Sequence, residues 1–330
     1  MPLTRGNTRS SKNERKNCLT MLEYAGRHPP MSNTTAEILS QPEMWRRASD
    51  LAREVAGLLP RPGERVCVVG CGTSLYMAQA WAALREEAGL GLTDAFAASE
   101  LPRGRDYDVL VAISRSGTTT EVAHVLADAP ASRSVALTAV PAGPVGERAD
   151  AVVELAFADE QSVVQTRFAT TALTLLRAHA GDGGVEQSIV DAERAVSAAL
   201  PVDPAAITQW TFVGRGWTVG LAHEAALKLR EAAQAWTEAY PAMEYRHGPI
   251  SVTSPTSAVW SMGPLDPALA AEVRATGATV VSSPLDPLAC LVLAQRTAVA
   301  AAEARGLDPD RPHNLSRSVV LSGSALRAFA

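Results

Sequence analysis

Short apolar runs alternate with helical stretches along the first half of the chain. Residues 65–69 and 109–113 are continuous runs of β-forming side chains, and each is followed by a loop and a predicted helix. Residues 135–138 and 151–157 are further apolar runs that we interpret as strands. Continuously apolar strands that alternate with helices are typical of a parallel sheet covered on both faces. The pattern therefore predicts a doubly wound α/β domain.

Helical spacing of apolar residues predicts where this domain begins. Ser40 and Glu43 have the spacing of a capping box, and apolar side chains then recur at helical intervals from Trp45 to Leu59, just before Pro60. Further helices are predicted over residues 162–180, after the glycine-rich stretch 181–184 as far as Leu200, and over residues 288–302.

The second half repeats the opening motif of the first. Residues 69–74 and 213–218 both read V-G-x-G-x-[S/T], at the end of an apolar run and before an alanine-rich helix. This repeat indicates internal duplication, so we expect two similar doubly wound domains. Strands of the second half are predicted at 211–214, 259–262 and 279–282. The expected boundaries are a disordered extension over 1–33, a first domain over 34–180, a linker region with a helix over 181–204 and a second domain over 205–330.

Composition and charge narrow the class of protein. The chain has 330 residues, 47% of them hydrophobic, and a net charge of −5, which excludes a disordered chain and argues against binding to nucleic acid. Four scattered cysteines make no disulfide framework, so we expect a reducing, cytoplasmic compartment. The sequence has no run of about 18 consecutive apolar residues, so we predict no membrane span. Residues 1–30 lack the apolar core of a signal peptide, and Met31 is an alternative start.

The glycine loops invite comparison with dinucleotide-binding folds. The Rossmann fingerprint G-x-G-x-x-G needs a third glycine for close helix–strand packing, but Leu75 and Val219 occupy that position. Neither loop contains the G-K-[S/T] of a nucleotide-triphosphate P-loop. We therefore expect no NAD and no other cofactor.

Hydroxyl side chains cluster where the first two strands pass into helices. Ligands of open parallel sheets bind beyond the carboxyl ends of the strands, where helix N-termini present free N–H groups and about half an elementary charge. Hydroxyls extend that set of donors without bulk, which suits a phosphate monoester. Ordinary N-capping is the alternative for either loop alone. The hydroxyl residues are Thr73, Ser74, Ser114, Ser116, Thr118, Thr119 and Thr120, and Gly72 is expected to bind the phosphate in the first loop.

One helical face in the second half carries three charged residues. Glu224, Lys228 and Glu231 follow at i, i+4 and i+7 among apolar neighbours. A solvated ion-pair ladder is the alternative, but a carboxylate beside a lysine in a partly buried cleft can serve as a general acid–base group. His247 is either a second candidate for proton transfer or a structural histidine. Metal binding is not expected, because Leu227 stands where H-E-x-x-H requires its second histidine.

Several short motifs resemble the sugar isomerase (SIS) domain family, in particular the isomerase half of glucosamine-6-phosphate synthase and its stand-alone relatives. The similarity runs from about residue 34 to the C-terminus, with the motifs in the family's order and spacing. They are C-G-T-S at 71–74, I-S-R-S-G-T-T at 113–119, E-A-A-L-K-L-R-E at 224–231, E-A-Y at 238–240 and H-G-P at 247–249. The resemblance implies two flavodoxin-like subdomains and a site for a hexose or hexosamine 6-phosphate.

The resemblance also implies roles for individual residues. Glu231 matches the carboxylate that moves a proton between C1 and C2 of the sugar, with Lys228 and Glu224 as its neighbours. His247 matches a ring-opening histidine that a second subunit donates, so the resemblance implies a homodimer with shared sites. The family's phosphate and sugar contacts match Ser74, Ser114, Ser116 and Thr119.

Two positions depart from the family's pattern. Arg115 replaces a neutral glutamine in the second hydroxyl loop, and we expect it to add positive charge near the ligand. Arg317 stands where the family carries a lysine associated with the open-chain sugar, and arginine does not readily form a Schiff base. No glutaminase domain precedes the matching region, so we do not expect glutamine-dependent synthesis of glucosamine 6-phosphate.

Together these features predict an enzyme that abstracts a proton next to the anomeric carbon of an amino-hexose 6-phosphate. Isomerisation, with or without loss of ammonia, is the expected outcome. The change to Arg317 leaves a second interpretation open, in which the same intermediate expels a hydroxyl at C3, as in a dehydratase of an N-acetylhexosamine 6-phosphate. A non-catalytic sugar-phosphate sensor is the third alternative.

Overall fold

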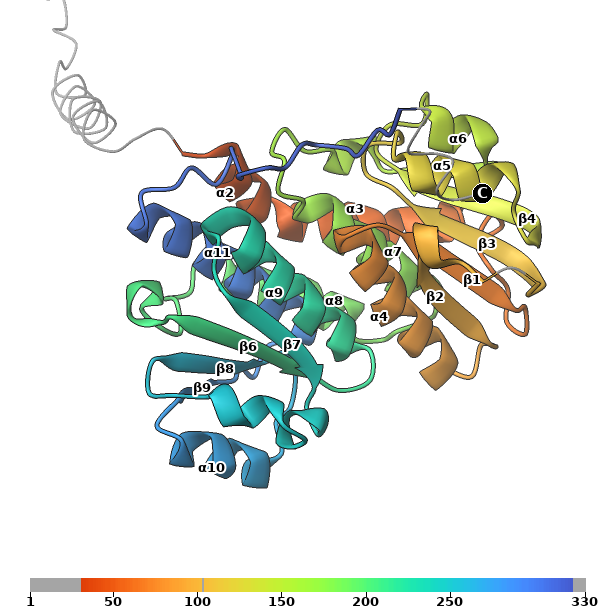
Figure 1. Ribbon diagram of the computed structural model, residues 1–330. Coiled ribbons are helices and arrows are strands. Elements are labelled where there is room, and N and C mark those ends of the chain that lie inside the picture. Colours follow the sequence, from red (N-terminus) through yellow and green to blue (C-terminus); the bar gives the residue numbers. More distant parts are fainter. Residues whose placement is uncertain (1–30, 103, 323–330) are drawn as a thin grey trace, which may run out of the picture. The chain divides into compact units, whose positions relative to one another are not determined.

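The computed structural model describes residues 31–102 and 104–322. The chain divides into two compact units, Met1–Ser32 and Asn33–Ala330, and the fold below is that of the second. The predicted disordered extension therefore lies almost wholly outside the described residues. The second unit contains two sheets with helices packed on their faces (Figure 1).

The first sheet is parallel throughout and has the strand order β2-β1-β3-β4-β5. This order is flavodoxin-like, with a switch point between β1 and β3. Every residue of β1 is buried, which explains its continuous apolar sequence. The apolar pattern misses β2, because only Thr93 of that strand is fully buried and Asp94 interrupts the run. The strands are β1 Val66–Gly70, β2 Thr93–Ala97, β3 Tyr107–Ile113, β4 Ala131–Thr138 and β5 Ala151–Glu154.

The second sheet repeats this order over its four strands, as β7-β6-β8-β9, and is also parallel. The predicted tandem of doubly wound subdomains is therefore confirmed. Strand β7 escapes the apolar pattern because Glu238 and Pro241 leave it only half-buried at the sheet edge. The strands are β6 Gln209–Gly214, β7 Thr237–Pro241, β8 Ser257–Ser261 and β9 Thr279–Val281.

Ten α-helices and five short 3₁₀ helices connect these strands within the described residues. The α-helices are α2 Asn33–Leu39, α3 Gln41–Glu54, α4 Thr73–Glu87, α5 Thr120–Ala127, α6 Pro144–Arg148, α7 Arg167–His179, α8 Val185–Ala195, α9 Thr218–Ala233, α10 Pro267–Ala275 and α11 Pro287–Ala304. The 3₁₀ helices are η1 Ala98–Glu100, η2 Ala156–Ala158, η3 Pro204–Ala206, η4 Glu244–Arg246 and η5 Pro249–Val252.

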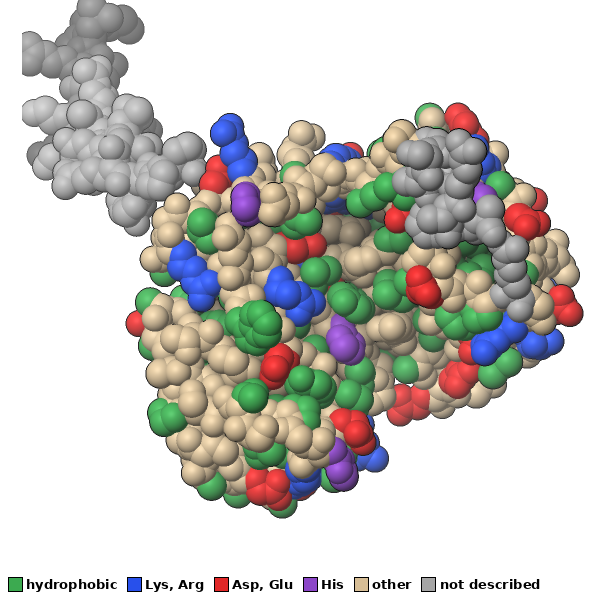
Figure 2. Space-filling view, in the orientation of Figure 1, with side chains coloured by type: hydrophobic (Ala, Val, Ile, Leu, Met, Phe, Trp, Pro, Cys, Tyr) green, Lys and Arg blue, Asp and Glu red, His purple; other side chains and the backbone are tan. Residues whose placement is uncertain are grey.

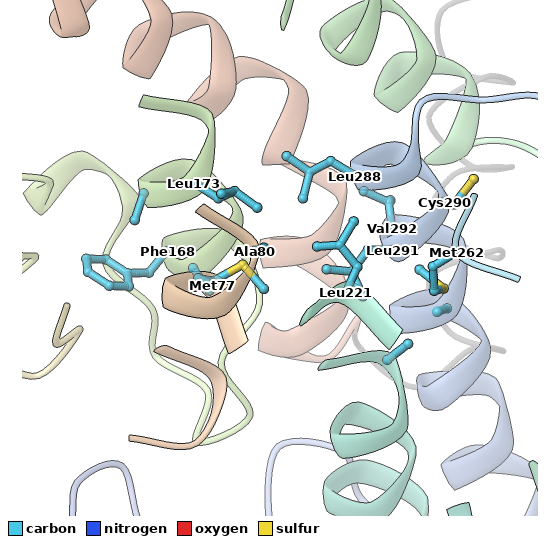
Figure 3. Close-up of a cluster of buried hydrophobic side chains, with 14 of the residues drawn as sticks. Met77, Ala80, Phe168, Leu173, Leu221, Met262, Leu288, Cys290, Leu291 and Val292 are labelled. Carbon is cyan, nitrogen blue, oxygen red and sulfur yellow. The ribbon is translucent and has the colours of Figure 1, made fainter. Parts of the chain in front are cut away.

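Helices α4 and α9 join the two halves through one buried cluster. Met77 of α4, Leu221 of α9 and Leu291 of α11 all belong to it (Figure 3). A Cβ atom on Gly220 would lie 2.5 Å from the carbonyl oxygen of Tyr76, so the close approach of α9 to α4 requires glycine. Each fully buried leucine stabilises the fold by about 1.5–3 kcal/mol. The helices that begin at the two glycine loops are thus packed rigidly against each other.

Two predictions for the first helix are wrong. The hydroxyl of Ser40 donates to the carbonyl oxygen of Glu37 and makes no capping hydrogen bond, because the chain is already helical in α2. Helix α3 also ends at Glu54, earlier than Leu59, because residues 55–58 form a turn.

Three later boundaries also differ from the prediction. The strand predicted over 151–157 ends at Glu154 and continues as η2, and the helix predicted to reach Leu200 ends at Ala195. The helix predicted from residue 162 begins only at Arg167, because the carboxylate of Glu160 accepts hydrogen bonds from the backbone N–H groups of Thr166 and Arg167 and so caps α7. The loop 159–166 that this creates becomes part of the site.

Acidic, basic and apolar residues are interspersed on the face shown in Figure 2. No helix in the described part of the chain is both long enough and apolar enough to cross a membrane.

Candidate active site

A cavity of about 190 Å³ lies beyond the carboxyl ends of β1 and β3, at the switch point of the first sheet. A larger groove of about 900 Å³ lies beyond β8 and β9, but the smaller cavity is the one that gathers most of the predicted site residues. Its lining comprises residues 71–74, 113–116, Thr119, Val163, Gln165, Glu231 and residues 315–319.

The first wall of the cavity is the turn from β1 into α4. A Cβ atom on Gly70 would lie 2.6 Å from the backbone carbon of Ser74, so this turn requires glycine. Gly72, with φ of +55°, is the N-cap residue and has no side chain with which to cap the helix. The start of α4, with the hydroxyls of Thr73 and Ser74, is therefore placed where a phosphate can serve as the cap.

The second wall is the loop from β3 into α5. The hydroxyl oxygen of Ser114 lies 3.3 Å from that of Thr119, and the hydroxyl oxygen of Ser116 lies 3.5 Å from it. Thr119 is the N-cap residue of α5, yet its hydroxyl makes no capping hydrogen bond. The hydroxyls gather at the cavity instead of capping the helix, which favours the phosphate interpretation.

Glu224, Lys228 and Glu231 lie on one face of α9, as their spacing predicts. Lys228 Nζ donates to Glu231 Oε2 at 2.5 Å, and to Thr73 Oγ1 and the carbonyl oxygen of Gln165 at 2.9 Å each. The side chains of Lys228 and Glu224 are 1% exposed, whereas that of Glu231 is 19% exposed and lines the cavity. The cluster is therefore no solvated ion-pair ladder, and Glu231 is its member that a ligand in the cavity can reach.

Burial sets the charge of this cluster. Desolvation raises the pKa of Glu224 to about 8, although its Oε1 lies 3.3 Å from Lys228 Nζ, so most of this carboxyl is protonated at neutral pH. Burial alone would lower the pKa of Lys228, but Glu224 and Glu231 outweigh that effect and raise it. Lys228 is thus a permanent ammonium that links Glu231 to the first hydroxyl loop.

Arg115 and Arg317 both line the cavity, but their guanidinium groups are held by the loop 159–166. Arg115 Nη1 lies 3.5 Å from Glu160 Oε2 in a buried ion pair. Arg317 Nη2 lies 2.5 Å from Asp159 Oδ1, and its Nη1 donates to the carbonyl oxygen of Glu160. Contrary to expectation, Arg115 presents no free positive charge to the cavity, because Glu160 compensates it.

His247 lies outside the lining of the cavity. It is exposed, and Gly248, with φ of +125°, turns the chain directly after it. Arg246 fixes this turn through Glu272 at 2.7 Å and Asp266 at 3.0 Å. The donation of His247 to a second subunit stays a prediction.

The C-terminal segment supplies cavity residues that local sequence patterns miss. Ser318 Oγ lies 3.0 Å from Ser116 Oγ and 2.9 Å from Thr118 Oγ1, on side chains about 200 positions away in the sequence. Gln165 contributes from the loop before α7. No glycine motif or periodicity marks these positions, because tertiary folding alone brings them to the cavity.

Side chains of the kinds that bind metals do not gather in the described part of the chain. No group of three or more His, Cys, Asp and Glu side chains is placed there to hold a metal ion. His223, from the incomplete H-E-x-x-H motif, instead stacks on Tyr76 with ring centroids 5.3 Å apart. Burial raises the pKa of Cys67 to about 12 and that of Cys71 to about 11, but only Cys67 is a packed thiol, because Cys71 is half-buried and lines the cavity.

Comparison with known sequences agrees with this arrangement. Residues 61–180, which carry both hydroxyl loops, match the model of the SIS domain. Over 86% of its length the chain is 28% identical to glutamine–fructose-6-phosphate aminotransferase (isomerizing) from Methanothermobacter thermautotrophicus. The match covers 57% of that protein, so the chain spans little more than half the length of this relative.

Solved structures of two phosphosugar enzymes share the fold. Glucosamine-6-phosphate deaminase from Thermotoga maritima has a TM-score of 0.77 at 24% identity, with 88% of this chain and 100% of the deaminase chain covered. The C-terminal domain of glucosamine-fructose-6-phosphate aminotransferase from Francisella tularensis has a TM-score of 0.74 at 21% identity, covering 85% and 98%. The likeness confirms the predicted architecture, and residues 61–180 match the SIS domain, the family that the sequence motifs resemble.

Proposed function

We propose that the chain is an enzyme that moves a proton next to the anomeric carbon of a hexose or hexosamine 6-phosphate. The observation that carries this proposal is the convergence of Glu231 and two hydroxyl loops on one cavity. The relatives named above support it, because their names describe enzymes of fructose 6-phosphate and glucosamine 6-phosphate.

The phosphate is held by uncharged donors. Since Glu160 compensates the charge of Arg115, the anion depends on the start of α4 and on hydroxyl groups. A hydrogen bond to a charged group contributes about 1.5–3 kcal/mol, so several such hydroxyls suffice for specific binding. The hydroxyls are those of Ser74, Ser114, Ser116 and Thr119.

Glu231 carries the proton. Its carboxylate removes a proton from C2 of the open-chain aldose, or from C1 of the ketose, and leaves an enediolate. The enediolate accepts that proton back on the neighbouring carbon while the hydroxyl proton passes between O1 and O2, so the carbonyl moves from one carbon to the other. Lys228 donates to Oε2 of Glu231 and so holds the carboxylate in place while Oε1 meets the substrate. A positioned acid–base group of this kind accelerates a reaction by about 10²–10⁴-fold.

His247 opens the sugar ring in the cavity of a second copy, so the working unit is a homodimer. Glu231→Gln and His247→Asn are each expected to be inactive alone. Mixed and refolded together, they regain about a quarter of the wild-type activity, because half of the dimers are mixed and each mixed dimer has one intact site. A mixture as inactive as its components would contradict shared sites.

Dehydration is the second candidate outcome, and the state of Arg317 favours it. Asp159 and Glu160 hold its guanidinium, so the C-terminal segment offers the substrate no amine where the family carries a lysine. Loss of the C2 proton to Glu231 leaves an enolate, and the C3 hydroxyl then leaves as water with that proton, which forms a double bond between C2 and C3 and needs no Schiff base. An N-acetylhexosamine 6-phosphate would be the substrate of that reaction.

A panel of substrates tests the proposal. The protein is incubated with fructose 6-phosphate, glucosamine 6-phosphate and N-acetylglucosamine 6-phosphate, and products are followed by NMR. We expect conversion of at least one of them, with the product separating isomerisation, loss of ammonia and dehydration. Glu87→Gln, an exposed site on α4, is the matched control for Glu231→Gln. No conversion of any compound would contradict the proposal and favour a sensor.

A further inference from the structure

The C-terminal residues 311–321, which we call the tail, are anchored at their start. Asp310 accepts hydrogen bonds from the backbone N–H groups of Asn33 at 2.7 Å and Thr34 at 2.8 Å, and from the hydroxyl of Thr34 at 2.7 Å. Its carboxylate therefore caps α2. The tail leaves this anchor with Asn314 at φ of +61°, a conformation that asparagine tolerates in turns.

The far end of the tail is tied to the first residue of α5. The backbone N–H of Thr120 donates to the carbonyl oxygen of Val319 at 3.2 Å, and the N–H of Leu321 donates to the hydroxyl of Thr120 at 2.9 Å. Residues 313–316, between the two anchors, are exposed. The tail gains little from burial there, so specific polar contacts must determine its position.

Two arginines supply those contacts. Arg115 Nη2 donates to the carbonyl oxygen of Arg317 at 2.9 Å, while its Nη1 pairs with Glu160. Arg317 reaches Asp159 and the carbonyl oxygen of Glu160. Glu160 is itself fixed, because it caps α7. We define the tail latch as Arg115, Asp159, Glu160 and Arg317.

The tail latch holds Ser318 against the second hydroxyl loop. Ser318 Oγ lies within 3.0 Å of the hydroxyl oxygens of both Ser116 and Thr118, and Ser318 lines the cavity. A hydroxyl can rotate to donate to an anion in place of a neighbouring hydroxyl. Ser318 is therefore placed to add a donor to the site from a segment outside both loops.

We propose that Arg115 and Arg317 are positioning residues of the tail latch, which holds the tail over the cavity so that Ser318 binds the phosphate group of the substrate. The two arginines that depart from the family's pattern thus act together on the tail and not on the sugar. The identity of the ligand rests on the proposed function, whereas the tail latch itself does not.

Hydrogen exchange tests the tail latch without any ligand. Asp159→Asn removes the charge that Arg317 pairs with, and Asp50→Asn, on the exposed face of α3, is the matched control. We expect amide exchange in residues 315–322 to quicken by about tenfold in Asp159→Asn only, with the exchange of α7 unchanged. Asp159→Glu keeps the charge and is expected to restore slow exchange. Equal exchange in Asp159→Asn and the control would overturn the tail latch.

Binding of inorganic phosphate and fructose 6-phosphate tests Ser318. We expect Ser318→Ala to weaken both by about tenfold in calorimetry, and Asp159→Asn to weaken both by about fivefold through loss of tail order. The enzyme assay should show a raised KM and little change in kcat for Ser318→Ala. Equal binding by Ser318→Ala and wild type would overturn this inference alone. Absence of binding to the wild type would overturn the proposed function as well, while the exchange result on the tail latch would still stand.

Discussion

The two glycine loops, residues 69–74 and 213–218, share the backbone turn at their first glycine but differ in what their hydroxyl side chains contact. Gly70 and Gly214 occupy the same place at the end of the first strand of each sheet, and a Cβ atom would meet backbone four residues ahead at 2.6 Å and 2.3 Å respectively. In the first loop Thr73 and Ser74 line a cavity, and the hydroxyl of Thr73 also accepts a hydrogen bond from Lys228. In the second, Thr218 accepts from the N–H of Arg215 at 2.8 Å and donates back to its carbonyl oxygen at 2.9 Å.

The second loop also has neighbours that fill its surroundings. The guanidinium of Arg177 lies 4.9 Å from the ring centroid of Trp217 and forms ion pairs with Asp182 at 2.7 Å and Asp286 at 3.0 Å. This buried cation is fully paired and offers nothing to an external anion. Duplication therefore repeats the turn, whereas the chemistry of a loop depends on whether a hydroxyl residue lines a cavity, as Ser74 does, or bonds only its own loop, as Thr218 does.

The largest expected effect concerns the glycine that ends the first strand of each sheet, Gly70 or Gly214. Gly70→Ala and Gly214→Ala should each lower the free energy of unfolding by about 2–4 kcal/mol, because the new methyl group meets fixed backbone. Urea denaturation of both variants measures this. A large loss at one position and none at the other would break the structural equivalence of the loops.

The next effect concerns Glu224, the buried carboxyl on α9. Glu224 has a pKa of about 8 in the folded state against an ordinary 4.5, so between these values the unfolded chain releases a proton that the folded chain keeps. The folded state therefore loses stability relative to the unfolded state as the pH rises from 5 to 8. Glu224→Gln should flatten this dependence, and denaturation at pH 5, 6.5 and 8 measures it. Parallel curves for the two proteins would contradict the raised pKa.

The smallest expected effects distinguish the hydroxyl of Ser74 in the first loop from that of Thr218 in the second. Ser74→Ala should weaken binding of inorganic phosphate by about tenfold and leave stability almost unchanged. Thr218→Ala should lose about 1 kcal/mol of stability and leave phosphate binding unchanged, because its hydroxyl serves only its own loop. Calorimetry measures phosphate binding and urea denaturation measures stability in both variants. A loss of stability in Ser74→Ala together with weaker phosphate binding in Thr218→Ala would contradict this difference between the loops.

Local sequence signals predict the parts of the site that one element supplies. Thr73 and Ser74 follow a buried strand directly, and Glu224, Lys228 and Glu231 have helical spacing, so their positions follow from strand ends and helix faces. The alternation of strands and helices in the first half follows equally from its apolar runs, whereas the order of the strands in the sheet does not.

Contacts between distant segments are what the sequence does not reveal. Ser318 reaches Ser116 only because the tail returns across the cavity, and the charge of Arg115 is compensated because the loop before α7 brings Glu160 to it. Neither pairing has a local pattern, since each depends on tertiary packing. The sequence pattern does not predict the edge strands β2 and β7 for a different reason. Their half-buried residues make no continuous apolar run.

Exchange of solvent deuterium into bound sugar phosphate tests the central claim most directly. The wild type, Glu231→Gln and the control Glu87→Gln are incubated in D₂O with fructose 6-phosphate and glucosamine 6-phosphate, and deuterium at C1 and C2 is followed by NMR. The wild type and the control should incorporate deuterium, and Glu231→Gln should do so about 10²–10⁴-fold more slowly. Undiminished incorporation by Glu231→Gln would contradict the role of Glu231 as the group that carries the proton.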